Sequence, residues 1–115
     1  MNTIINIAQQ YTRFPGGRYP EDGDGNGTDF RERFLLPILA QHQHATIILD
    51  GAAGYPSSFL DEAFAGLVRK HGYSAKQVLA AFTFVADQPN LKPFVEMIKR
   101  YVSQAPSSNG HAMVQ

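Results

Sequence analysis

The sequence alternates short apolar, β-branched runs with longer amphipathic segments, and this alternation limits the possible folds more than any other feature. Strand-like composition is found in residues 3–8, 45–50 and 81–86. Apolar side chains recur at spacings of three and four, as in helices, in residues 28–43, 57–72 and 89–104. Strands that alternate with helices predict an α/β domain with a small mixed, partly parallel sheet.

Length and composition set the broad class of the protein. A chain of 115 residues suits one core, so we expect a single domain in residues 1–104 and a flexible tail in residues 105–115. Ten basic residues balance ten acidic ones and are scattered, which argues against a dedicated nucleic-acid binder. Cysteine is absent, which excludes disulfides and thiolate chemistry. We see no signal peptide and no apolar run long enough to span a membrane, so the expected compartment is the cytoplasm.

Two sequence patterns resemble metal sites, but neither is complete. In the segment DGDGNG, Asp22 begins a calcium-loop pattern, yet the position that requires a bidentate glutamate holds Arg33. His42 and His44 lie near the end of a predicted helix, without a nearby carboxylate or a third histidine. We therefore expect no metal and no cofactor.

Ser57 and Ser58 stand where an apolar run gives way to a helical pattern. A serine nucleophile would need a G-x-S-x-G turn, but Phe59 replaces the second glycine. His71 would lie about 20 Å from Ser58 along the same helix, too far for proton transfer. Two interpretations therefore stay open. In one, Ser58 is an N-cap that forms a capping box with Asp61. In the other, the pair accepts a phosphate beside the exposed N–H groups of the helix start.

Three segments together resemble a known family: RFPGGRYPEDG, FRERFLLPIL and GYPSSFLDEAFAGLVR. The pattern is similar to the STAS-like domains of unknown function, relatives of the STAS domains of anti-sigma-factor antagonists, over roughly residues 4–102. The resemblance implies a STAS-like α/β fold with helices packed mainly on one face. It also places Ser58 at the phosphoacceptor position, with Ser57 before it, although Pro56 and Phe59 depart from the antagonist pattern.

The resemblance implies a non-enzymatic regulatory module that binds a protein partner, with a histidine-kinase-type ATPase as the expected one. The expected contact residues are Tyr55, Pro56, Phe59 and Asp61, bordered by Arg13 and Arg18. Two other classes stay open. One is a phage-encoded inhibitor that uses the same fold to block a host protein. The other is a small enzyme or ligand binder that relies on Asp50, Asp61 or the Arg18 loop, which a deep pocket with convergent polar groups would favour.

Overall fold

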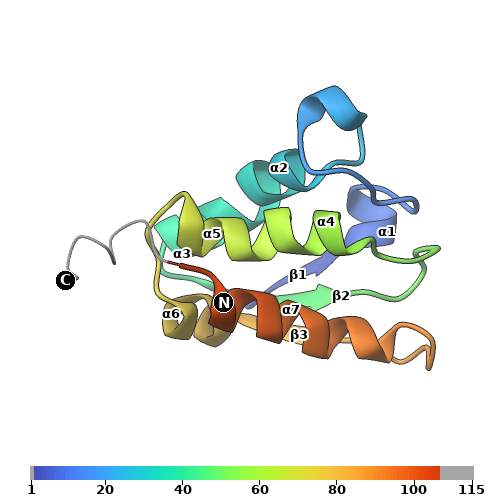
Figure 1. Ribbon diagram of the computed structural model, residues 1–115. Helices are drawn as coiled ribbons and strands as arrows, with labels where there is room; N and C mark the ends of the chain where they lie inside the picture. The colour runs from blue at the N-terminus through green and yellow to red at the C-terminus, as the bar shows by residue number, and fades with distance from the viewer. Residues whose placement is uncertain (1, 107–115) are drawn as a thin grey trace.

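The computed structural model describes residues 2–106, and a three-stranded sheet lies at its centre (Figure 1). The strands are β1 (Asn2–Asn6), β2 (His44–Ile48) and β3 (Phe82–Val85), in the order β1-β2-β3. Both pairings are parallel. In this register Ile47 of β2 lies opposite Ile5 in β1 and opposite Phe84 in β3. The predicted α/β class is confirmed, and the sheet that we expected to be mixed is parallel in both described pairings.

The helices cover one face of this sheet. The strands lie side by side in chain order, so both crossover connections run in the same direction across the sheet. Because such crossovers are right-handed, their helices fall on the same face. On that face Ile5 and Ile47 are buried, whereas the neighbouring Ile4, which points to the other face, is 59% exposed. The expected one-sided packing is confirmed.

Two long helices and α7 (Lys92–Gln104) form the helical layer. The first long helix comprises α2 (Gly27–Phe30), the π-helical turn η2 (Arg31–Leu35) and α3 (Leu36–Ala40). The second comprises α4 (Ser57–Leu60), the π-helical turn η3 (Asp61–Ala65) and α5 (Gly66–Arg69). The second helix lies between the first and α7 and contacts both of them (Figure 1). The two π-helical turns contact each other where the long helices pack together.

A π-helical turn directly precedes Pro37 in the first helix, and the second long helix forms such a turn without a proline. Proline has no N–H, so the carbonyl of Arg33 loses its usual donor four residues later. The N–H of Leu36 reaches back to the carbonyl of Arg31, five residues before it, which is the bond of a π-helical turn. The helix continues past Pro37 to Ala40.

Two short helices were absent from the sequence-based assignment. The first strand was expected to reach Ala8 but ends at Asn6, whose side chain accepts a hydrogen bond from the N–H of Gln9 and caps α1 (Ile7–Gln10). The helix α6 (Ala75–Ala81) precedes β3, which begins at Phe82. Its start is a capping box between Ser74 and Gln77, a local signal that is present in the sequence.

The other helix ends agree with the sequence in part. The first long helix, whose pattern was expected to begin at residue 28, is capped by Asn26, and the Asn26 side chain accepts from the N–H of Asp29. Gly72, the last residue of the predicted range 57–72, follows the second long helix with a φ of 77°, the left-handed conformation that glycine often adopts after a helix end. A short 3-10 turn, η1 (Pro20–Asp22), lies in the loop before α2.

Aromatic rings fill the core between the sheet and the helices. Phe30, Phe59 and Phe64 are fully buried. The ring centroid of Phe30 lies 5.8 Å from that of Phe59 and 6.1 Å from that of Phe64. No helix in residues 2–106 combines the length and the apolar character needed to cross a bilayer. The tail predicted for residues 105–115 lies almost entirely outside the described range.

Candidate functional site

The second long helix begins at Ser57, two residues earlier than the capping hypothesis requires. Pro56 occupies the N-cap position, and no side chain caps this helix. Ser57 is exposed and Ser58 is half-buried. The predicted capping box of Ser58 and Asp61 is therefore wrong, because both serines lie inside the first turn and Asp61 bonds elsewhere.

Two of the predicted contact residues belong to the core. Tyr55 is 3% exposed and Phe59 is fully buried, so neither offers a surface to a partner. The hydroxyl of Tyr55 donates to the carbonyl of Leu49 at 2.8 Å, and its ring lies 5.5 Å from that of Phe94 in α7. Burial raises the pKa of Tyr55. The expected contact role of this pair is thus corrected to a packing role that holds the start of α4 against the sheet and α7.

The loop around Arg13 lies directly beside the start of α4. The N–H of Ala53, in the loop that precedes α4, donates to the carbonyl of Arg13 at 2.9 Å. Phe14 is 72% exposed, with the guanidinium of Arg13 over its ring at 6.0 Å. Arg13, Pro56 and Ser57 are also exposed. We call Arg13, Phe14, Pro56 and Ser57 the helix-start surface.

Arg18 connects the same loop to the second helix one turn further along. Its Nη1 lies 2.7 Å from Oδ2 of Asp61, and Arg69 holds the other carboxylate oxygen at 3.0 Å. The hydrogen bond that Arg18 donates to Asp61 raises the pKa of Arg18. The backbone of Arg18 is fixed on both sides, since its N–H donates to Asp22 and its carbonyl accepts from Thr28. The structure thus brings together Arg18 and Asp61, which the sequence had placed on one site.

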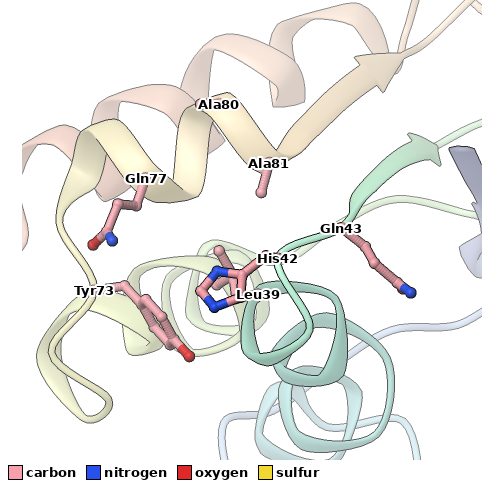
Figure 2. Close-up of a pocket in the computed structure, with 7 residues that line it drawn as sticks. All are labelled: Leu39, His42, Gln43, Tyr73, Gln77, Ala80 and Ala81. Atoms are coloured by element: carbon pink, nitrogen blue, oxygen red, sulfur yellow. The ribbon is translucent and has the colours of Figure 1, made fainter. Parts of the chain in front are cut away.

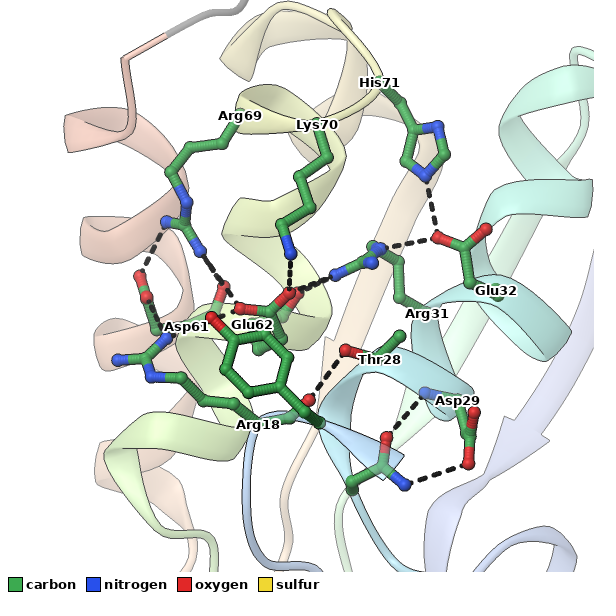
Figure 3. A network of polar contacts seen from close by, with 12 residues as sticks. Arg18, Thr28, Asp29, Arg31, Glu32, Asp61, Glu62, Arg69, Lys70 and His71 are labelled. Carbon is green, nitrogen blue, oxygen red and sulfur yellow. Dashed lines mark hydrogen bonds and ion pairs between the residues drawn. The ribbon is translucent and has the colours of Figure 1, made fainter. Parts of the chain in front are cut away.

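A buried ion pair, absent from the sequence-based prediction, joins the two long helices (Figure 3). Nη1 of Arg31 donates to Oε2 of Glu62 at 2.8 Å and to the Glu62 carbonyl at 2.7 Å. The two side chains are 4% and 1% exposed. Lys70 also binds Oε2 of Glu62 at 2.8 Å. Burial raises the pKa of Glu62, but the hydrogen bonds from Lys70 and Arg31 outweigh it, and the pKa is lowered.

Glu32 connects the buried Arg31–Glu62 ion pair to the surface. Nε of Arg31 donates to Oε2 of Glu32 at 2.7 Å, and Nε2 of His71 lies 2.7 Å from the same oxygen. Burial raises the pKa of Glu32, whereas the hydrogen bonds from His71 and Arg31 lower it, and the net shift is downward. All three segments that carry the family resemblance therefore meet here: Arg18 from the first, Arg31 from the second, and Glu62 from the third.

Small residues let the two helices approach closely enough to form this pair. A Cβ on Gly27 would lie 2.8 Å from the carbonyl oxygen of Phe59 and 3.0 Å from the Cβ of Glu62. A Cβ on Gly66 would overlap the guanidinium of Arg31.

The sequence contains a signal for the buried Arg31–Glu62 pair, since Arg31, Leu35 and Ile38 follow the spacing of one helix face. A charged residue in that apolar stripe indicates a buried partner.

The loop with the incomplete calcium pattern is held by its own hydrogen bonds. Oδ2 of Asp22 accepts the N–H groups of Arg18 and Tyr19, each at 3.0 Å, and Asn26 caps α2. Among residues 2–106 no group of three or more histidine and acidic side chains is arranged to bind a metal.

A pocket of about 310 Å³ lies between the end of α3 and α6 (Figure 2). The lining residues are Leu39, His42, Gln43, Tyr73, Gln77, Ala80 and Ala81. His42 has a φ of 56° and ends α3 in the position that glycine usually takes. His44, which the sequence placed near the end of a helix, is instead half-buried in β2, with its Nε2 2.9 Å from the hydroxyl of Thr83.

The residues on which a small enzyme was expected to rely lie outside this pocket. Asp50 accepts the N–H groups of Asp87 and Gln88, at 2.9 Å and 2.8 Å, and these bonds lower its pKa. They connect the loops that follow β2 and β3. Asp61 and Arg18 are bound to each other. The acidic residues named for the enzyme hypothesis therefore have structural partners.

The comparisons with known proteins bear on the whole arrangement. Residues 26–90, more than half of the chain, match the model of the STAS-like domain of unknown function (DUF4325). This range contains the Arg31–Glu62 pair and both serines but begins after Arg13 and Arg18. No curated protein and no solved structure matches the chain. The family match and the parallel α/β fold agree, and the chain belongs to the family of STAS-like domains of unknown function.

Proposed function

We propose that this domain is a non-enzymatic protein-interaction module of a cytoplasmic regulatory system, and that it binds its partner through the helix-start surface. The observation that carries the proposal is the exposure of Phe14, which is 72%. A large exposed ring in a loop that is bonded to the segment before a helix can serve as an anchor for a protein interface. The hydrogen bond between Ala53 and Arg13 fixes the loop and the helix start relative to each other, so the surface is preformed.

The second part of the proposal is a charge switch at Ser57 or Ser58, with a histidine-kinase-type ATPase as the partner and kinase. Ser57 and Asp61 are four residues apart and share one helix face. A phosphate on Ser57 would bring about −1.5 to −2 charges near the guanidinium of Arg18, which Asp61 now holds. Because the Arg18 side chain is 37% exposed and its backbone is fixed, only the side chain would turn. The neutral and phosphorylated forms would then present different charges to a partner.

The proposal can be tested with a photo-crosslinking amino acid placed at position 14 in the full chain, expressed in its own host. A matched control carries the same amino acid at Gln41, which is exposed and lies at the opposite end of the sheet, where β2 begins. We expect position 14 to crosslink to one partner and position 41 not to do so. Equal crosslinking at both positions, or none at position 14, would contradict the docking surface.

Phosphosite mapping on the same material tests the switch. We expect a phosphate on Ser57 or Ser58, and we expect Ser57→Glu and Ser58→Glu to reduce crosslinking from position 14. A crosslinked partner without an ATPase domain, combined with unmodified serines, would support the docking surface and contradict the hypothesis that the partner is a kinase. That outcome would favour the inhibitor that blocks a host protein.

A further inference from the structure

The strand β3 has an open edge. The N–H of Leu49 donates to the carbonyl of Val85 at 2.9 Å, which fixes the direction of the main-chain groups along this strand. Thr83 and Val85 direct their N–H and C=O groups toward β2, so those of Phe84 point away from the sheet. No residue in the described range hydrogen-bonds the main chain of Phe84. An unpaired edge of this kind is a template for another strand.

A groove runs beside this open edge. It has a volume of about 440 Å³ and is lined by Leu79, Phe82, Thr83, Phe84 and Lys99. Phe82 and Phe84 lie on the sheet face that the helices cover, and Lys99 projects from α7. A strand added to β3 would place every second side chain over this apolar surface, within reach of the Lys99 ammonium.

The charge of the groove indicates what kind of strand it fits. Lys99 forms no ion pair with any residue between 2 and 106. A second copy of the chain paired across a two-fold axis at this edge would bring two Lys99 side chains together, which costs free energy. Residues 107–115 of this chain contain no acidic residue.

We propose that the β3 edge binds an extended segment of a partner protein, with apolar residues at alternate positions and an acidic residue that pairs with Lys99. This surface is separate from the helix-start surface. The partner's main chain would pair with the N–H and C=O of Phe84, and the groove would select its side chains.

The test begins with a library of random peptides of about nine residues, the usual length of a strand, selected on the full chain. We expect the enriched peptides to alternate apolar residues and to carry an acidic residue. In the presence of such a peptide, hydrogen exchange at the Phe84 amide should slow by about tenfold. The amides of Thr83 and Val85, which already face β2, serve as internal controls and should not change.

A charge swap makes the test specific. Lys99→Glu should reverse the selection, so that basic peptides are enriched, and should weaken the binding of acidic peptides by roughly fivefold. Substitution of the exposed Lys76, Lys76→Glu, is the matched control and should leave the preference for acidic peptides unchanged. Enrichment of peptides that leave Phe84 exchange unchanged, or no enrichment at all, would overturn the proposal.

Two results in the free protein would also overturn it. Slow exchange at Phe84 that becomes fast on dilution would mean that a second copy occupies the edge. Slow exchange that becomes fast when residues 107–115 are deleted would mean that the chain's own C-terminal segment does so. We expect exchange at Phe84 to be fast in the free chain under all these conditions.

Discussion

The start and the middle of the second long helix are both polar in sequence but differ in their surroundings. The start exposes Ser57 and carries no side-chain cap. One turn later, Glu62 is 1% exposed and is bound by Arg31 and Lys70. The comparison separates two roles. The polar residues at the start are exposed or half-buried, whereas the charged residue in the middle is required by the fold because its loss would leave the buried Nη1 of Arg31 without its carboxylate partner.

Removal of the buried carboxylate should destabilise the protein more than any other single substitution proposed for this helix. We expect Glu62→Gln to lower the free energy of unfolding by about 3–5 kcal/mol, since Arg31 would lose its charged partner inside the protein. Urea denaturation measures this change. The control is Glu32→Gln, whose side chain is 39% exposed and should cost less than about 1 kcal/mol. Equal effects of the two substitutions would show that burial does not distinguish the two ion pairs.

The close approach of the two helices should be nearly as sensitive. Gly27→Ala would place a Cβ against the backbone of Phe59, and backbone cannot move aside as a flexible side chain can. We expect a loss of about 1–3 kcal/mol, as for overpacked cores. Gly54→Ala is the matched control, because nothing lies within 4 Å of its Cβ position, and it should change stability by less than about 0.5 kcal/mol. If Gly27→Ala does not lower the free energy of unfolding, the two helices can move apart without a loss of stability.

The buried pair should also make stability depend on pH. The pKa of Glu62 in the folded protein is lowered from its ordinary value of 4.5. Its contribution to stability is therefore complete above the pKa of the unfolded chain and is lost as the pH falls through the lower pKa of the folded form. We expect the free energy of unfolding, measured between about pH 3 and pH 7, to fall at the acidic end. Glu62→Gln should reduce that slope, and an unchanged slope would assign the dependence to other carboxylates.

The sequence predicted those parts of the fold that depend on local pattern. The strand before Ser57, the second long helix and its left-handed Gly72 follow from residues within one or two turns of each other. Predictions failed where a local signal was overlooked, as with the Ser74 capping box that starts α6, or where a distant residue holds the side chain. Asp61 satisfied a capping pattern with Ser58, but Arg18, far away in the chain, holds its carboxylate.

The candidate site divides in the same way. Tyr55 and Phe59 were correctly placed next to the serines, yet sequence could not tell that they point toward α7 and the core. Arg31 and Glu62 belong to different helices, so no spacing within one segment relates them. Each could be suspected alone, as a charge on an apolar helix face, but their pairing depends on how the helices pack.

The smallest expected effect tests the start of the helix. Ser58→Ala should change the free energy of unfolding by less than about 0.5 kcal/mol, because no side chain caps α4 and the hydroxyl of Ser58 forms no hydrogen bond within residues 2–106. Ser74→Ala is the matched comparison. The Ser74 hydroxyl accepts the N–H of Gln77 at 3.0 Å, and the Gln77 side chain returns a bond to the Ser74 N–H at 2.8 Å.

Loss of the Ser74 capping box should cost about 1 kcal/mol. The difference between the two serines, measured by thermal or urea unfolding, decides whether Ser58 has a structural role. A cost at Ser58 as large as that at Ser74 would mean that its hydroxyl stabilises the helix start in solution. A negligible cost at Ser58 would leave its hydroxyl free for modification or partner contact, and would complete the contrast with Glu62 on the same helix.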